Sequence, residues 1–218
     1  MNLVAASFAW PFRGAWRSKW AIGVFAVLLL PIAFIPLLGY AVAATRSASI
    51  DPKAGPPPWT ISGRLVADGL WTTLAVLLVT APFALALNPL TAVIEQAHLW
   101  HVGDRSLSHV YAVIAAAFVL ALPWGILMLL LIPHATMRFA ASGNPLDLFN
   151  FAASVRAVSR DFATWNLAAA AIVTGWAIGL AGVGLLCVGV VPGVFYAILV
   201  SAHAAAALNP KTANSSAR

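Results

Sequence analysis

The sequence predicts an all-α fold: a polytopic helical membrane protein with about four full transmembrane helices, a proline-interrupted N-terminal hairpin (re-entrant or kinked) and two amphipathic interfacial helices. Two observations predict this class. Of the 218 residues, 62% are hydrophobic and only 8% are charged, whereas a soluble domain carries about 25% charged residues. Four long stretches also contain no charged residue. A soluble enzyme, a soluble nucleic-acid-binding domain and a disordered chain are therefore excluded.

The charge-free stretches set the number of predicted spans. A transmembrane helix requires about 20 apolar residues, so the second and third stretches hold one span each and the long fourth stretch holds two. Glycine and proline punctuate helices, and Gly189–Pro192 is the turn expected inside the fourth stretch. We expect a single transmembrane domain over residues 1–208 and a short polar tail over 209–218. The four predicted spans lie near Leu70–Leu87, Val110–Ile132, Leu167–Leu185 and Gly189–Leu208.

The first stretch, Trp20–Thr45, differs from the others because it contains Pro31 and Pro36. Proline inside a helix breaks or kinks it. The halves Trp20–Leu30 and Leu37–Thr45 each have about 10 residues, or about 15 Å at 1.5 Å per residue, which reaches halfway across a hydrocarbon core of about 30 Å. The stretch is therefore either one kinked span or a re-entrant hairpin with its prolines at mid-depth.

The positive charges favour the hairpin. The net charge is +6, and the twelve lysine and arginine residues are placed between hydrophobic runs, which is typical of topology signals and of contacts with anionic lipid headgroups. With a hairpin and a cytoplasmic N-terminus, eleven of the twelve lie inside and only Arg105 lies outside. A spanning first stretch gives eight inside and four outside, and it places the N-terminus outside. The positive-inside rule therefore predicts that the N- and C-termini are cytoplasmic.

This topology places two broadly amphipathic segments in the cytoplasm. The segment Trp59–Trp71 carries Arg64 and Asp68 beside its apolar positions, and Leu146–Trp165 carries Arg156 in the same way. Such helices commonly lie in the membrane interface, with the apolar face toward lipid and the basic residues toward the headgroups. A helix that caps the cytoplasmic end of the bundle is the alternative for each segment.

The strongest group of metal-ligand residue types follows the second span. Glu-x-x-His on a helix places two ligands on one face, as carboxylate-bridged metal sites require, and imidazole suits zinc, iron and copper. Glu-x-x-His occurs only once in the chain, however, so a wet interfacial loop with several histidines is the favoured interpretation. We therefore predict no metal ligand and no cofactor. The residues concerned are Glu95, His98, His101, Asp104 and His109.

Other chemistry-bearing residues are few. Asp68 precedes Gly69 and is expected to cap the second span, and His203, near the cytoplasmic end of the last span, is expected to contact water. A proton- or ion-coupled transporter usually needs more ionisable groups inside the membrane. The lone Cys187 lies in an apolar run, which excludes an intrachain disulfide. Glycines over 179–189 suit close helix packing. We predict no catalytic residue and no enzyme.

Several short motifs resemble a known family. The sequence is similar to the prokaryotic membrane family named domain of unknown function 4013 over nearly its whole length. The resemblance implies a multi-pass protein of the prokaryotic plasma (inner) membrane with no assigned activity, and it supplies no catalytic residues. The motifs are Phe8-x-x-Pro11-Phe12, Trp16-x-x-Lys19-x-x-Ile22-Gly23, Gly39-Tyr40, Pro58-Trp59, Asp68-Gly69-Leu70, Ile132-Pro133, Arg138-Phe139-Ala140 and Phe149-x-Phe151.

Three functions remain open at this point. The leading expectation is a non-enzymatic membrane module that binds membrane lipids or partner membrane proteins, for example as an accessory subunit, and that binds no nucleic acid. The alternative is a permease or channel-like transport component for a small or lipidic substrate. A metal-dependent membrane enzyme that uses the loop from Glu95 to His109 is the third.

Overall fold

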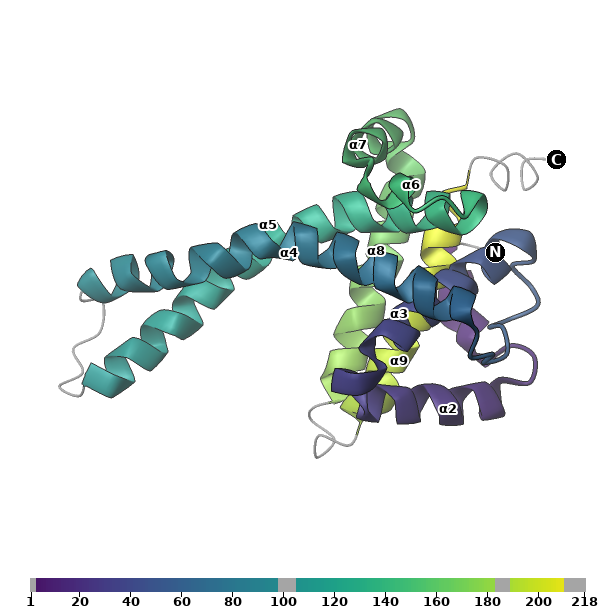
Figure 1. The fold of residues 1–218 in the computed structure, drawn as a ribbon, viewed down its shortest axis with the longest axis horizontal. Coiled ribbons are helices and arrows are strands. Elements are labelled where there is room, and N and C mark those ends of the chain that lie inside the picture. The colour runs from purple at the N-terminus through teal and green to yellow at the C-terminus, as the bar shows by residue number, and fades with distance from the viewer. Residues whose placement is uncertain (1–2, 98–104, 183–188, 210–218) are drawn as a thin grey trace. The chain divides into compact units, whose positions relative to one another are not determined.

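A computed structural model describes residues 3–97, 105–182 and 189–209 (Figure 1). Within these ranges the chain forms α-helices and one short 3-10 helix, without any strand. Four helices are long and apolar enough to cross a membrane, namely α3, α4, α5 and α8, so the all-α polytopic prediction is confirmed. In chain order the elements are α1 (Leu3–Ala9), η1 (Trp10–Phe12), α2 (Trp16–Leu28), α3 (Leu30–Ile50), α4 (Gly63–Gln96), α5 (Arg105–Ser142), α6 (Leu146–Phe149), α7 (Phe151–Arg160), α8 (Phe162–Ala181) and α9 (Val190–Ala206).

The chain divides into two compact units. Unit 1 consists of Met1–Thr73 and Leu130–Arg218, and unit 2 consists of Leu74–Leu129. Unit 2 is the helical hairpin formed by the later part of α4 and the earlier part of α5. The expected single domain over residues 1–208 stays a prediction, and the expected tail over 209–218 lies outside the described residues except for Asn209.

The second and third predicted spans lie inside helices that are longer than expected. Leu70–Leu87 falls within α4, and Val110–Ile132 falls within α5. The two helices have 34 and 38 residues, or about 51 and 57 Å at 1.5 Å per residue. Both lengths exceed a hydrocarbon core of about 30 Å.

The last two spans differ from the prediction. The span expected at Leu167–Leu185 corresponds to α8, whose described part ends at Ala181. The helix α9 has only 17 residues, and α3 is the fourth long apolar helix instead. The turn expected at Gly189–Pro192 is wrong because Pro192 lies in the first turn of α9, where a proline has no helical hydrogen bond to lose.

The proline-containing stretch forms a helical hairpin, and the bend falls at Leu29 rather than between the prolines. Pro31 lies at the start of α3, and Pro36 lies inside this helix. The two arms are unequal, with 13 residues in α2 and 21 in α3. Proline is favoured in the first turn of a helix, since its missing N–H is an unpaired group there in any case. Pro31 therefore begins a helix instead of ending one.

The open ends of this hairpin lie side by side. Nη1 of Arg13 donates a hydrogen bond to the carbonyl oxygen of Pro52 at 3.1 Å, and Nζ of Lys19 donates to the carbonyl oxygen of Pro56. Nε1 of Trp59 donates to the carbonyl oxygen of Lys19 at 3.1 Å. The chain therefore returns after α3 to the place where α2 began, as a hairpin requires.

The core of unit 1 surrounds α9, which packs against α8, α3 and α2. Trp10, Tyr40 and Phe195 are fully buried there, and the ring of Tyr40 stacks on Trp59 with the ring centroids 3.8 Å apart. Glycines over 179–189 were expected to suit close helix packing, and among the described residues α8 and α9 do approach closely at Gly179. A Cβ on Gly179 would lie 2.4 Å from the carbonyl oxygen of Gly193.

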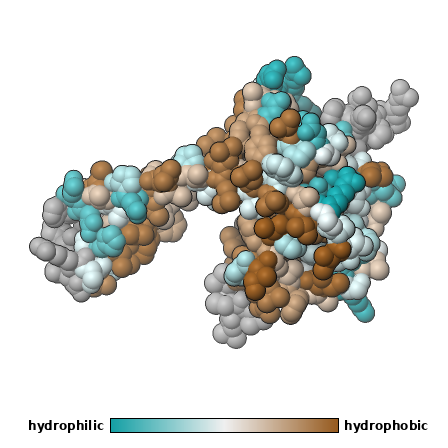
Figure 2. All heavy atoms as spheres, in the orientation of Figure 1, coloured by the Kyte–Doolittle hydropathy of each residue, from teal (hydrophilic) through white to brown (hydrophobic). Residues whose placement is uncertain are grey.

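Large apolar side chains are exposed on both units, and Figure 2 shows them over much of the visible face of each. Ile32 is 84% exposed in unit 1, while Leu85 and Phe118 are 78% and 75% exposed in unit 2. Apolar surface of this extent suits contact with lipid, because monomeric soluble proteins rarely expose large contiguous apolar patches.

Only one of the two amphipathic segments forms helices of its own. Leu146–Trp165 forms α6, α7 and the first turn of α8. Trp59–Trp71 instead consists of irregular backbone followed by the start of α4. Ser62 ends the irregular part, since its Oγ accepts a hydrogen bond from the N–H of Leu65 at 3.2 Å and so caps the helix.

Candidate functional site

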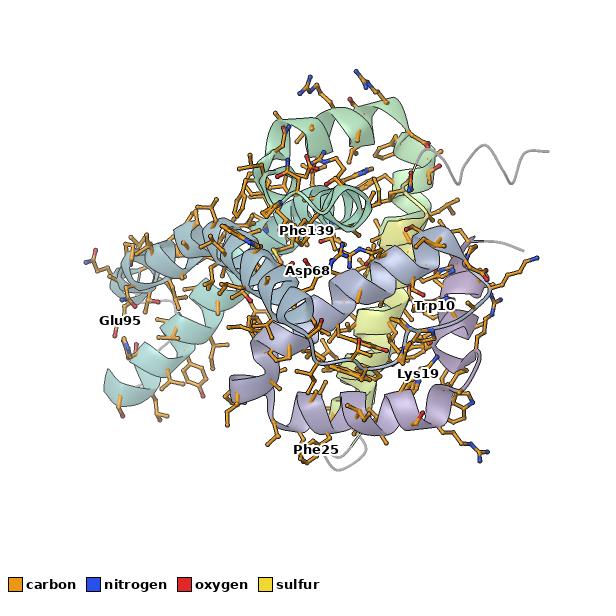
Figure 3. All side chains as sticks on the ribbon, turned by 45° about the vertical axis from the view of Figure 1, so that its right-hand side comes forward. Trp10, Lys19, Phe25, Asp68, Glu95 and Phe139 are labelled. Atoms are coloured by element: carbon orange, nitrogen blue, oxygen red, sulfur yellow. The ribbon has the colours of Figure 1, made fainter. Side chains whose placement is uncertain are left out.

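Three helices of unit 1 meet at a partly buried ion pair. Nη2 of Arg46, in the last part of α3, lies 3.1 Å from Oδ2 of Asp68 on α4. Nε of the same arginine donates a hydrogen bond to the carbonyl oxygen of Ala140, near the end of α5, at 2.9 Å. The side chain of Arg46 is 22% exposed and that of Asp68 is 10% exposed. Asp68 thus lies in the interior of unit 1 (Figure 3).

This position corrects the sequence prediction for Asp68. It does not cap a helix, because α4 already begins at Gly63 and Asp68 lies within it. Its charge is satisfied by Arg46, which is 22 residues earlier in the chain. No helical spacing signals this pairing, since only side chains three or four residues apart face each other on one helix.

Two glycines bring α3 and α4 close enough for the ion pair. A Cβ on Gly39 would lie 1.9 Å from the carbonyl oxygen of Leu65, and a Cβ on Gly69 would lie 2.0 Å from that of Ile35. Any larger residue would therefore force the two backbones apart. Small residues permit such close approach in membrane helices, and the approach here lets Arg46 reach Asp68.

A hollow of about 320 Å³ opens beside the ion pair. The ends of α3 and α5, the start of α4 and the segment after α9 all contribute to its wall. None of the described residues that line it is acidic. Its polar lining residues are Arg46, Ser49, Arg64, Ser142 and Asn209.

Arg64 is the cation of this hollow that has no partner among the described residues. It is exposed, and it precedes Asp68 by four residues, the spacing of a favourable ion pair on a helix. Asp68 pairs with Arg46 instead. Nη2 of Arg64 lies 3.7 Å from where a Cβ of Gly143 would be. The left-handed backbone of Gly143, with φ +71°, favours glycine at this point of the wall.

A second arginine, Arg138, bonds nearby through Nη2, while its buried Nε has no hydrogen-bond partner among the described residues. Its Nη2 lies 2.9 Å from the carbonyl oxygens of both Asp147 and Asn150 and 3.2 Å from Oγ of Ser154. Ser154 is fully buried, and its Oγ donates to the carbonyl oxygen of Leu131 at 3.2 Å. These bonds fasten α6 and α7 to the end of α5, so Arg138 has a structural role.

Exposed cations of α7 and exposed apolar side chains of α6, α7 and α8 lie close together in the sequence, and these residues are called the α7 surface below. Arg156, Arg160 and Val155 (45% exposed) belong to α7. Leu146, at the start of α6, is 72% exposed, and Phe162, at the start of α8, is 60% exposed. The opposite face packs inward through buried Ser154 and Val158. An exposed surface of this kind is typical of helices that lie at a membrane surface.

Asp161 separates α7 from α8 and caps the longer helix. Hydrogen bonds from the side chain and the backbone N–H of Thr164 hold the pKa of Asp161 below its ordinary value. The backbone bond, from N of Thr164 to Oδ1 of Asp161, is 3.1 Å long. The carboxylate thus satisfies one of the unpaired donors at the start of α8.

The structure brings together only part of the predicted ligand group. In unit 2, Nδ1 of His109 lies 3.4 Å from Oε2 of Glu95, while His98, His101 and Asp104 lie outside the described residues, as does Cys187. Within the described part of the chain, no three His, Cys, Asp or Glu side chains approach one another closely enough to hold a metal ion. The absence of a metal ligand therefore stays a prediction.

A buried polar contact in unit 1 was missed by sequence reasoning. Oγ of Ser7 lies 2.9 Å from Nδ1 of His203, and these residues are 0% and 5% exposed. The expectation that His203 contacts water is therefore wrong. Trp10 covers the imidazole at a centroid distance of 5.4 Å. The contact joins α1 to α9 across 196 residues of sequence, a separation that no local pattern reveals.

Comparison with known proteins places the chain in a family without assigning it an activity. No curated protein and no solved structure matches the sequence. A family model described as "Protein of unknown function (DUF4013)" matches residues 22–200. This match covers both units and most of the chain, and it agrees with the resemblance seen in the sequence motifs. The protein belongs to the DUF4013 family.

Proposed function

We propose that this protein is a non-enzymatic membrane module that binds anionic lipid headgroups on the cytoplasmic side through the α7 surface, which consists of α7 and the first residues of α6 and α8. The observation that supports this function is the combination of Arg156 and Arg160 with exposed Val155, Leu146 and Phe162. Apolar side chains on this surface enter the boundary of the acyl chains, while the two guanidinium groups remain among the headgroups.

The attachment of α7 to the rest of unit 1 gives this surface a fixed orientation. Ser154 and Val158 anchor the inward face, and Arg138 holds the preceding residues through the carbonyl oxygens of Asp147 and Asn150. Because protein contacts already hold α7 in place, lipid binding does not have to supply the free energy for ordering this helix. Each cation near an anionic membrane surface contributes about 1 kcal/mol of attraction, so two arginines give about 2 kcal/mol.

Recovery of lipids with the protein tests this function. The full chain is extracted from membranes in polymer nanodiscs, and the phosphatidylglycerol content of the discs is compared with that of the bulk membrane by mass spectrometry. We expect the discs of the natural sequence to be enriched in phosphatidylglycerol. In the double variant Arg156→Gln and Arg160→Gln this enrichment should fall at least several-fold, because about 2 kcal/mol of attraction is removed.

The matched control replaces the same residues by lysine, which keeps the charge. Arg156→Lys and Arg160→Lys should retain most of the enrichment, since a membrane surface attracts either cation. Equal phosphatidylglycerol content in the discs and in the bulk membrane would refute lipid binding. Solute flux across vesicles that contain the protein would favour the transport component instead.

A further inference from the structure

We infer that the hollow lined by Arg46 and Arg64 is a specific site for the phosphate group of one anionic lipid. This inference rests on the proposed function, because it adds a defined headgroup site to a module that already associates with anionic lipid through α7. The site is distinct from the α7 surface, since neither Arg156 nor Arg160 lines the hollow.

The size of the hollow suits a headgroup. Its volume is about 320 Å³, at the lower limit of the range of about 300–1,000 Å³ that holds drug-sized ligands. A phosphate group with a small alcohol fits such a volume, whereas the acyl chains of a lipid must remain outside it.

Arg64 supplies the charge that attracts the phosphate. It makes no hydrogen bond or ion pair with any described residue, because Arg46 occupies the neighbouring carboxylate of Asp68. A guanidinium group presents paired N–H donors in a plane, the geometry that binds phosphate oxygens in bidentate fashion. Gly143 carries no side chain, so nothing from this residue covers Nη2 of Arg64.

Arg46 supplies a second, preoriented donor. Its Nε bonds to Ala140 and its Nη2 bonds to Asp68, which leaves Nη1 without a partner among the described residues. Because two of its nitrogens are fixed by protein, little conformational freedom is lost when the third meets a ligand. The carboxyl-terminal ends of α3 and α5 oppose an anion, and the bond from Arg46 to Ala140 offsets part of that effect.

An apolar rim favours a lipid phosphate over free phosphate. Ile50 lines the hollow and is 80% exposed. A glycerol backbone and acyl chains would cover this side chain, whereas inorganic phosphate would leave it in contact with water. The geometry therefore points to a lipid as the ligand of this site.

Titration with two ligands tests the inference. The full chain is placed in neutral phosphatidylcholine nanodiscs, and bound molecules are counted by native mass spectrometry as phosphatidic acid is added, or inorganic phosphate in parallel. We expect one phosphatidic acid to bind with the highest affinity, and Arg64→Gln to weaken this step by about tenfold or more, as for the loss of a charged hydrogen bond. Inorganic phosphate should bind far more weakly than phosphatidic acid.

Two variants separate this site from the α7 surface. The double variant Arg156→Gln and Arg160→Gln should keep the high-affinity step, and Arg64→Lys should recover part of it. Unchanged melting of Arg64→Gln in detergent confirms that the variant folds, as expected for a side chain that makes no hydrogen bond or ion pair with a described residue.

Each remaining outcome overturns part of the account. If Arg64→Gln binds phosphatidic acid like the natural sequence while the α7 variant loses phosphatidylglycerol enrichment, the hollow is not the site and the proposed function stands. If inorganic phosphate competes as well as phosphatidic acid does, the lipid assignment is wrong. If the natural sequence binds neither ligand and enriches no anionic lipid, both proposals fail.

Discussion

Arg46 and Asp68 connect three helices of unit 1 with two side chains. Exposed ion pairs contribute less than about 1 kcal/mol, whereas removal of one partner from a fully buried pair costs about 3–5 kcal/mol. The side chains of this pair are 22% and 10% exposed, so the free energy lost on breaking it is expected to lie between these two values. Its loss also affects Ala140, whose carbonyl oxygen accepts a bond from the same guanidinium group.

Asp68→Asn should therefore destabilise the protein by about 2 kcal/mol, because Arg46 keeps its charge but loses the carboxylate. Thermal unfolding in detergent measures the effect. Arg64→Gln, which removes a cation that has no partner among the residues the structure describes, is the control and should change the stability by less than about 0.5 kcal/mol. Equal melting temperatures for Asp68→Asn and the natural sequence would show that the ion pair does not hold the helices together.

Asp161 provides a pH-dependent contribution at the start of α8. Its pKa is lowered in the folded protein by the hydrogen bonds from Thr164, so the carboxylate form favours folding. This contribution is complete above the unfolded pKa, near 3.9, and is lost as the pH falls through the lower folded pKa.

Asp161→Ala should cost about 1 kcal/mol at neutral pH, the usual effect of removing an N-cap. Asp161→Asn keeps an acceptor oxygen and should cost less. Chemical denaturation of α8 is followed at pH 7 and at about pH 3, and the difference between the natural sequence and Asp161→Asn should shrink at the lower pH. A difference that grows on acidification would mean that the carboxylate does not stabilise the helix.

At the scale of helices, glycine contacts set the spacing of α3 and α4. The close approaches at Gly39 and Gly69 are to backbone carbonyl oxygens, which cannot rotate away as a flexible side chain can. Added methyl groups in a tightly packed interface cost about 1–3 kcal/mol and sometimes more. The ion pair at Arg46 depends on the same spacing.

Gly39→Ala should therefore cost about 3 kcal/mol and weaken the binding of phosphatidic acid, because it moves Arg46 away from the hollow. Gly125→Ala in α5 is the matched control, since nothing lies within 4 Å of the added Cβ, and alanine is the better helix former by about 1 kcal/mol. Thermal unfolding of both variants separates packing from helix propensity. Similar melting of Gly39→Ala and Gly125→Ala would contradict the close approach of α3 and α4.

For the whole molecule, the sequence predicts those features that charge and apolar runs express directly. The spans at Leu70–Leu87 and Val110–Ile132 lie inside α4 and α5 because charged residues interrupt the chain on either side of them. The bend at Leu29 was not predictable, since Pro31 suits the start of a helix as well as a break. The pairings of Arg46 with Asp68 and of Ser7 with His203 join residues 22 and 196 positions apart, and only tertiary packing creates them.

Contacts within unit 1 support a common side of the membrane for its cations. Arg13 and Lys19 bond to the segment that follows α3, and Arg46 bonds to Ala140 at the end of α5. Asn209, after α9, lines the same hollow as Arg46. The positive-inside rule predicts that these parts of the chain are cytoplasmic, and the lipid sites proposed above require the same orientation.

The central proposal is that the part of unit 1 that carries Arg13, Lys19 and Arg46 is cytoplasmic, and that the connection between α4 and α5 lies outside. Single cysteines test it most directly, introduced as Ser18→Cys, Ala54→Cys, Ser106→Cys and Ser142→Cys in a Cys187→Ala background. Intact cells are treated with a membrane-impermeant maleimide, and labelling after solubilisation shows that each cysteine can react. The account predicts outside labelling at position 106 alone. Outside labelling at position 18 with protection at position 54 would show that the α2–α3 stretch spans the membrane, and would contradict it.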